Sequence, residues 1–254
     1  MRWQKSGVAF LLGMTCLLLS QLSLAMDDQQ AHEIVDHVDT ILRKNSSSGQ
    51  VRMEISTENW RRTLTMHIWS RGREDALVRI TQPSKEAGTA TLKVKENLWT
   101  YLPKVNRTIK IPTSMMMASW MGSHFTNDDL VKESRLIRDY VVITSFEGER
   151  GGVQVYEYTL TPKPDAVVVW GKIIIEVHQA DRMPRWERYY DEDGKLIREL
   201  TFSDYKIIDG ELVPTRLIMR PADKAGEQTT ILYDDIVFNV EISDDTFSLP
   251  NLAR

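Results

Sequence analysis

The chain is almost without cysteine, because Cys16 is the only one in 254 residues. A single cysteine excludes a disulfide framework within one copy of the chain. Cys16 lies inside an apolar run, and the Gly13-Met14-Thr15 before it is a poor match to the small-residue pattern that precedes a lipidated cysteine. We therefore expect a domain that folds without disulfides and carries no lipid anchor of its own.

Catalytic and metal-binding motifs are also missing. The sequence has no Gly-x-Ser-x-Gly nucleophile elbow and no Gly-x-x-x-x-Gly-Lys-Ser/Thr phosphate loop. His32 and His37 are five residues apart, whereas a zinc-binding helical pair needs a spacing of four. Asp191-x-Asp193-Gly194 lacks the further ligands of a calcium loop and is typical of a hairpin turn. We expect no enzyme, no metal site and no cofactor.

Positive charge is in deficit. The chain has 32 Lys and Arg against 36 Asp and Glu. Without Arg2 and Lys5, which lie in the amino-terminal segment, 30 basic residues remain and the net charge becomes −6. Nucleic-acid binding depends on neutralising phosphates, so this balance argues against nucleic acid as a partner.

The amino terminus has the pattern of a secretory signal. Two basic residues precede the apolar run Gly7–Ser20, and Ser23-Leu24-Ala25 supplies the small residues of a cleavage site. The run is shorter than the roughly 20 residues that span a bilayer. We expect residues 1–25 to be cleaved as a signal peptide, leaving one exported domain, residues 26–254, in the periplasm.

The rest of the chain predicts one helix followed by many strands. Apolar residues recur at helical spacing from Ala31 to Leu42, and the turn Asn45–Gly49 is expected to end this helix. Period-two alternation then predicts about eleven antiparallel strands joined by short turns. Four are centred on residues 51–55, 64–68, 78–80 and 92–94, and seven lie at 140–146, 153–161, 167–177, 186–190, 195–202, 212–220 and 229–238.

The segment Leu98–Leu130 interrupts this alternation with large apolar residues and two prolines. Methionine is flexible and polarizable, and aromatic rings offer broad surfaces, so such a cluster can contact a pliable ligand or fill a core. We expect the stretch from Thr113 to Leu130 to cover an apolar cavity. His124 follows the methionines and is a candidate for the cavity mouth.

Three blocks of sequence carry a resemblance to a known family. They are LWTYLPKVNRTIKIP (98–112), SWMGSHFTNDDL (119–130) and YYDEDGKLIRELTFSDYKIIDGELVPTRLIM (189–219). In this order they resemble the LolA-like outer-membrane lipoprotein-sorting proteins. The resemblance implies a mainly β fold, an unclosed antiparallel β-barrel of about eleven strands whose apolar concave face is covered by helices.

The resemblance also implies a function. Proteins of this family carry acylated lipoproteins across the periplasm, which implies a chaperone-like carrier with an inner-membrane transporter as donor and leaves open an outer-membrane receptor. An alternative is a lipid-binding accessory protein of an inner-membrane lipid exporter. A third class, the sensors of this scaffold, has an additional partner-binding domain, for which the end of the chain after Phe247 leaves no room.

The candidate ligand contacts follow from the alternating strands and the interrupted segment. Arg198 alternates in phase with Leu200 and Phe202, so it either faces the cavity or marks an error of phase, and a charge among apolar groups needs a partner. The predicted lipid-binding residues are Met53, Met66, Ile80, Trp99, Tyr101, Met116, Met117, Trp120 and Met121.

Overall fold

The structure is a computed structural model that describes residues 29–132 and 136–253. The predicted signal peptide, residues 1–25, lies outside the described residues. None of the helices in the described part is both long and apolar enough to cross a membrane.

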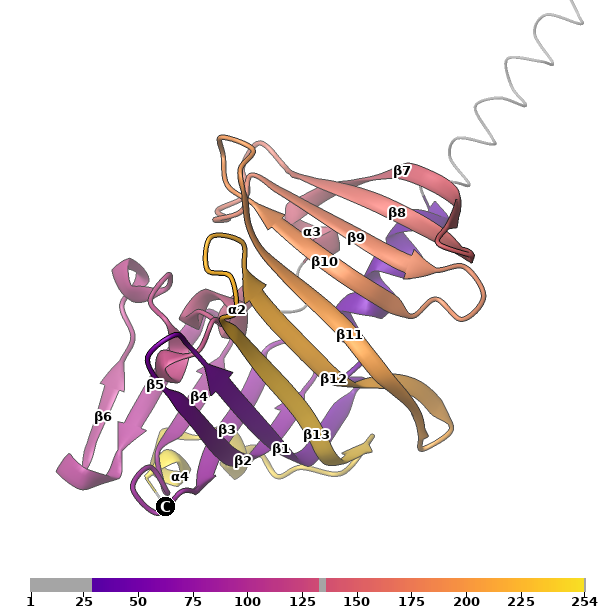
Figure 1. The fold of residues 1–254 in the computed structure, drawn as a ribbon. Helices are drawn as coiled ribbons and strands as arrows, with labels where there is room; N and C mark the ends of the chain where they lie inside the picture. The colour runs from indigo at the N-terminus through magenta and orange to yellow at the C-terminus, as the bar shows by residue number, and fades with distance from the viewer. Residues whose placement is uncertain (1–28, 133–135, 254) are drawn as a thin grey trace, which may run out of the picture.

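The described residues fold into thirteen strands with short helical segments between and around them (Figure 1). The strands are β1 (Ser46–Ser56), β2 (Arg61–Arg71), β3 (Asp75–Gln82), β4 (Ala90–Val94), β5 (Asn97–Leu102), β6 (Arg107–Lys110), β7 (Tyr140–Arg150), β8 (Val153–Pro162), β9 (Lys172–His178), β10 (Pro184–Tyr190), β11 (Leu196–Ile208), β12 (Glu211–Pro221) and β13 (Gln228–Phe238).

The helical segments are short apart from the first helix, which occupies residues 29–40. The others are η1 (Pro103–Val105), η2 (Thr113–Met115), η3 (Trp120–Gly122), α2 (Asn127–Lys132), α3 (Leu136–Asp139), η4 (Asp244–Phe247) and α4 (Leu249–Leu252).

All thirteen strands belong to one antiparallel sheet. Its order is β6-β5-β4-β3-β2-β1-β13-β12-β11-β10-β9-β8-β7, so two meanders are joined where β1 pairs with β13. Strands β6 and β7 form the two ends and do not pair with each other, so the sheet is twisted and curved but unclosed (Figure 1). The predicted mainly β, unclosed antiparallel fold is confirmed.

The predicted strand count of eleven is wrong. The two additional strands, β5 and β6, lie at the start of the segment Leu98–Leu130, in which the alternation is interrupted. Pro103 begins the 3-10 turn η1 between the two strands, and Pro112 follows β6, so neither interrupts a ladder. The strand expected at 167–177 is shorter than predicted, because β9 begins at Lys172.

The expected turn Asn45–Gly49 is also wrong, since β1 already begins at Ser46. Gly49 lies in the β1–β13 pair, next to an irregularity of register between Gln50 and Val51. A Cβ atom at Gly49 would lie 2.3 Å from the carbonyl oxygen of Asp235. The glycine is therefore needed for strand contact rather than for a turn.

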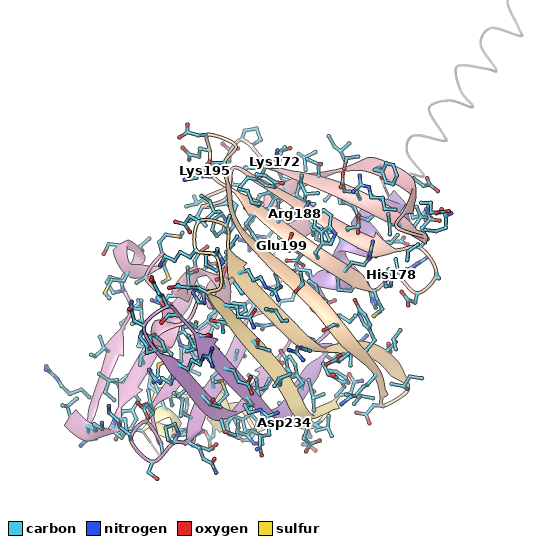
Figure 2. The ribbon with its side chains drawn as sticks, in the orientation of Figure 1. Lys172, His178, Arg188, Lys195, Glu199 and Asp234 are labelled. Carbon is cyan, nitrogen blue, oxygen red and sulfur yellow. The ribbon has the colours of Figure 1, made fainter. Side chains whose placement is uncertain are left out.

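The two faces of the sheet differ. The first helix packs its apolar residues, among them Ile34 and Val35, against Tyr158 and Ile175 of β8 and β9; Figure 1 shows this helix in indigo behind that half of the sheet. The opposite face of β10 and β11 is charged: the Nε atom of Arg188 donates to Glu199 over 2.7 Å. Figure 2 labels both residues on these neighbouring strands. In this half of the sheet, the face toward the first helix is therefore apolar and covered, and the opposite face is charged.

Near the other end of the sheet the outer face is covered as well. Leu77 and Leu92 of β3 and β4 pack against Phe247 and Leu252 of the carboxyl-terminal segment. The guanidinium of Arg79 donates to the backbone carbonyl of Asn251 over 2.8 Å, which fixes α4 to β3. Strands β3–β5 consequently bury apolar side chains on both faces.

Candidate functional site

A cavity of about 270 Å³ lies between the sheet and the segments that pack on its inner face. The strands on both sides of the β1–β13 pair supply its apolar wall, and the first helix, η3, α2, α3 and the stretch 168–170 supply the rest. The aliphatic, methionine and aromatic residues that line it from the strands are Val51, Met53, Met66, Ile68, Trp69, Ala76, Val78, Leu98, Tyr140, Ile173, Tyr189, Leu200, Phe202, Leu217, Met219, Ile231 and Tyr233.

The alternation of the strands explains this wall. Residues two apart on one strand face the same side, and directly paired residues on neighbouring strands share a face. Met53 and Met66 therefore reach the cavity together with Val51, which pairs with Met66. On β12, Leu217 and Met219 do the same. Flexible methionine and leucine side chains make a surface that can adapt to an apolar ligand.

Charged groups also line the cavity, mostly from the segments that cover the sheet. They are Asp39, Arg43, Lys93, Asp128, Asp129, Asp139 and Glu187. Burial of a charge requires a partner, and the structure supplies such partners. The ammonium of Lys93 donates to the carbonyl of Arg73 over 2.8 Å, and the backbone N–H of Leu136 donates to Asp39 over 3.1 Å. The cavity is thus amphiphilic.

Arg198 of β11 is held against this wall by an ion pair with α2. Its side chain is almost fully buried, and Nη1 donates to Oδ2 of Asp129 over 2.7 Å while Nη2 donates to Oδ1. The guanidinium also lies against the rings of Trp170 and Tyr189, at 4.4 and 4.5 Å from their centroids. The partners of Arg198 line the cavity. The alternation of Arg198 in phase with Leu200 therefore indicated the cavity side of the sheet.

The charge state of this cluster is fixed by its surroundings. Burial alone would lower the pKa of Arg198, but the charge of Asp129 and its hydrogen bonds keep that pKa above its usual value. Burial raises the pKa of Tyr189 far above its usual value, and the charge of Glu187, to which its hydroxyl donates, raises it further. Arg198 is therefore a cation and Tyr189 a neutral donor.

Asp129 also caps the amino-terminal end of α2. Its carboxylate accepts from the backbone N–H of Thr126 over 2.7 Å, and its own N–H donates to the hydroxyl of Thr126 over 3.2 Å. This reciprocal pair is a capping box that starts the helix. One carboxylate thus both caps α2 and joins it to β11.

His124 lies beside this cluster rather than on the cavity wall. Its ring nitrogens are 2.8 Å from the hydroxyl of Thr229 and 3.1 Å from Glu227, and its backbone carbonyl is 3.5 Å from Arg198. The hydrogen bond from His124 lowers the pKa of Glu227. In the described part of the chain, no group of three or more His, Cys, Asp or Glu could hold a metal ion.

The nine predicted lipid-binding residues do not all line the cavity. Met53, Met66 and Trp120 line the cavity, and the indole N–H of Trp120 donates to Thr91 over 3.2 Å. Ile80 and Met121 pack in the same hydrophobic cluster without being part of the lining.

The other four predicted residues lie away from the cavity. Trp99 and Tyr101 pair with Leu92 and Ala90, and these residues pack under the carboxyl-terminal segment, on the opposite face of the sheet. Met116 is half-buried, and Met117 is exposed. Ligand contact by these residues stays a prediction.

Several lining residues were not among those predicted. Leu200, Leu217 and Met219 come from strands whose alternation was recognised, so the in-phase residues of β11 and β12 could have been named. No sequence pattern pointed to Asp39 or Asp129, because their place depends on how the first helix and α2 pack.

An unclosed antiparallel sheet that curves around a cavity, with short helices on its inner face, is the architecture of LolA-like proteins. A DUF1329 family protein from Desulfovibrio piger matches with a TM-score of 0.80 and 22% identity over 89% of this chain and 99% of that one. An outer-membrane lipoprotein-sorting protein domain from Vibrio parahaemolyticus matches with a TM-score of 0.77 and 22% identity, over 89% and 100%. A LolA superfamily protein from Nitrosomonas europaea matches at 0.73 and 24%, over 87% and 98%.

A family model described as "Uncharacterized protein" matches residues 72–254, more than half of the chain. The chain belongs to that family, which is DUF1329-like. The solved structures show that it has the LolA-like fold, which confirms the resemblance inferred from the sequence. The comparison with curated proteins returns no match. At these identities the solved structures define the fold, and function is argued from the cavity.

Proposed function

We propose that the chain is a periplasmic carrier that shields the acyl chains of lipoproteins in its cavity during sorting to the outer membrane. The observation that carries the proposal is the apolar wall formed by Met53, Met66, Leu217 and Met219 inside a LolA-like sheet. The names of two similar structures, a lipoprotein-sorting domain and a LolA superfamily protein, support it. The role is binding, and no catalytic step is assigned to the chain.

The energetics of acyl transfer indicate which partners such a carrier needs. Three acyl chains of roughly 15 methylenes at ~0.8 kcal/mol each would cost ~36 kcal/mol to place in water. Non-covalent affinity saturates near about 20 kcal/mol, so the carrier must offer an apolar surface while another protein supplies the energy. The sequence has no phosphate loop. An inner-membrane transporter is therefore the proposed donor, and an outer-membrane receptor is a candidate acceptor.

The size of the cavity favours a second candidate, a lipid-binding accessory protein of an inner-membrane lipid exporter. Small-molecule pockets usually measure about 300–1,000 Å³, and this cavity of about 270 Å³ lies just below that range. In this state it suits one chain of a single lipid better than three chains of a lipoprotein. The lipoprotein function additionally requires the covering segments to move away from the sheet.

A fluorescent fatty acid tests whether the cavity binds lipid. We expect the probe to bind with micromolar affinity or better and to be displaced by unlabelled lipid. Leu217→Trp fills the cavity from β12 and should weaken binding at least tenfold, while Ile207→Trp, on the exposed part of β11, should leave it unchanged. Equal binding by both variants, each shown to be folded by circular dichroism, would refute the cavity as the binding site.

A series of fatty acids distinguishes the two cargo classes. Each buried methylene is worth about 0.8 kcal/mol, or about fourfold in affinity, until the cavity is full. A plateau within one chain, with no gain for diacyl lipids, would favour the single-lipid function. A rise that continues through diacyl and triacyl ligands would favour lipoprotein cargo, and mass spectrometry of material that co-purifies from the periplasm would identify it.

A separate experiment tests whether the stretch from Thr113 to Leu130 covers the cavity through its methionines. We propose that Met116→Ala combined with Met117→Ala weakens lipid binding at least tenfold while the melting temperature changes by only a few degrees. Neither residue lines the cavity in this state, so the effect requires the segment to close over a bound chain. Unchanged affinity in the double variant would show that Met116 and Met117 do not contact the ligand. Of the predicted residues, Met53, Met66 and Trp120 would then remain as the candidates that line the cavity.

A further inference from the structure

One stretch of the chain, residues 104–119, is exposed almost throughout, and we call it the edge segment. Among its residues only Ile111 and Met116 are half-buried. Its exposed apolar side chains are large: Val105 is 58% exposed, Ile109 44%, and Met115 and Met117 are each 48% exposed. Single exposed apolar residues are ordinary, but a run of them along one edge indicates an interaction surface.

The charge of the edge segment is opposite to that of the chain. Lys104, Arg107 and Lys110 are exposed, and no acidic residue occurs between Glu96 and Asp128. In the described ranges none of the three cations forms an ion pair. A chain with an acidic excess thus has one acid-free stretch in which three unneutralised cations lie among apolar side chains.

The first part of the edge segment forms one end of the sheet, and its second part, from Thr113 to Ser119, lies beside α2. Strand β6 is the terminal strand, and Figure 1 shows β5 and β6 in magenta and pink extending beyond the rest of the molecule. The pairing of Leu102 with Arg107 and of Trp99 with Lys110 places the cations on both faces of the hairpin. An edge-on approach therefore brings both faces and the free edge of β6 to the same surface.

The hairpin is well defined in shape. Asn106 has a left-handed backbone with φ of 47° at the end of η1, and the hydroxyl of Tyr101 donates to its side-chain oxygen over 3.0 Å. The ammonium of Lys110 lies 5.8 Å from the centroid of the Trp99 ring. These contacts hold the exposed residues in place before any partner arrives.

We propose that the edge segment docks the protein on the surface of an anionic lipid bilayer. Lysine and arginine bind anionic headgroups while their methylene stems and neighbouring apolar side chains enter the interface. Protein interfaces are depleted in lysine and enriched in aromatic residues, methionine and arginine. The methionines of the edge segment would suit either partner, but two of its three cations are lysines and it has no aromatic and no acidic residue, so its composition favours an anionic bilayer over a protein partner.

Docking through the edge segment goes beyond the proposed carrier function and does not require it. It would place the covering segments of the cavity close to the bilayer, because Trp120, which lines the cavity, follows the edge segment directly. A lipid chain that moves between membrane and cavity would then cross only a short distance through water.

Vesicle flotation tests the proposal. We expect the protein to float with vesicles of phosphatidylcholine and phosphatidylglycerol at low salt, to bind pure phosphatidylcholine at least tenfold more weakly, and to lose binding as salt rises. Each basic residue near an anionic surface contributes about fivefold. Changing Lys104, Arg107 and Lys110 to Gln together should therefore weaken binding at least tenfold.

A matched triple variant controls for net charge. Lys85, Lys195 and Lys206 are exposed and lie outside the edge segment, so their joint change to Gln should leave binding within twofold of the unmodified protein. Ile109→Ser should weaken binding, whereas Ile207→Ser should not. Equal losses in the two triple variants, or no flotation of the unmodified protein with anionic vesicles, would overturn the proposal.

The fatty-acid probe separates this inference from the carrier function. The triple variant of the edge segment should bind the probe as the unmodified protein does, because its three residues do not line the cavity. A variant that loses vesicle binding but keeps the probe would support docking by the edge segment. Binding of the edge segment to an acidic protein surface, with no affinity for anionic vesicles, would refute the bilayer as its partner.

Discussion

The ion pair between β11 and α2 gives the sharpest prediction, because its two members have unequal surroundings. The side chain of Arg198 is only 5% exposed, whereas that of Asp129 is 19% exposed and also accepts hydrogen bonds from Thr126. Removing the carboxylate leaves a buried cation, but removing the cation leaves a carboxylate that keeps other donors. Asp129→Ala should therefore destabilise the protein more than Arg198→Met.

The magnitudes follow from these contacts. Stranding one member of a buried pair costs about 3–5 kcal/mol, and loss of the capping box at Thr126 costs about 1 kcal/mol more. We expect about 4–6 kcal/mol for Asp129→Ala and about 1–2 kcal/mol for Arg198→Met, because the carboxylate left behind keeps its other donors. The double variant Arg198→Met with Asp129→Ala should cost less than the sum of the two single changes, because it leaves no stranded charge.

Urea denaturation followed by tryptophan fluorescence measures these differences, since Trp170 lies directly against Arg198. Thr126→Ala serves as a control that removes only part of the cap and should cost about 1 kcal/mol. If Arg198→Met were the more destabilising change, or if the two changes were additive, the pair would not act as described.

Three further predictions concern other parts of the fold. Gly49→Ala should lower the free energy of unfolding by at least about 2 kcal/mol in a thermal or urea titration, because the new Cβ would meet the Asp235 carbonyl at 2.3 Å between β1 and β13; a neutral effect would refute that close contact. Met219→Ala should cost about 2 kcal/mol, the low end for a buried methionine, because a cavity already adjoins it; a cost above 4 kcal/mol would indicate a solid core. His124 lowers the pKa of Glu227, so the ionised carboxylate stabilises the fold at pH values above its unfolded pKa of about 4.3. This stabilisation is lost as pH falls through the lower folded pKa. Glu227→Gln should therefore make the free energy of unfolding fall less steeply below about pH 4.3, and an unchanged slope would contradict the coupling.

Most of the sheet could be predicted from alternation, and the exceptions have a common cause. Period-two patterns identify strands with one apolar face, but β5 and β6 belong to a part of the sheet with unusual surroundings. β6 is exposed along its whole length, and β5 has Leu98 facing the cavity and Trp99 packed on the other side. Neither strand shows a simple alternation, and Pro103 lies in the turn between them.

The cavity lining was predictable from sequence only where the alternation of a strand is clear. Met53 and Met66 line the cavity because each is in phase with apolar neighbours that face the covered side of the sheet. Trp99 and Tyr101 followed the same rule but belong to the face that the carboxyl-terminal segment covers, and alternation does not say which face a distant segment will cover. The partner of Arg198 lies 69 residues away in α2, beyond the reach of any local pattern.

The distribution of polarity around the cavity indicates how a bound amphiphile would lie. The strands contribute mainly aliphatic and methionine side chains, whereas the first helix, α2 and α3 contribute carboxylates, among them Asp39, Asp128 and Asp139. An acyl chain gains most by lying along the strands. A cationic or hydrogen-bond-donating end would gain most beside the carboxylates, whereas an anionic end would be repelled by them. Because Asp129 joins that polar side to Arg198 of the sheet, a ligand whose headgroup competes for Asp129 would loosen α2 as it binds.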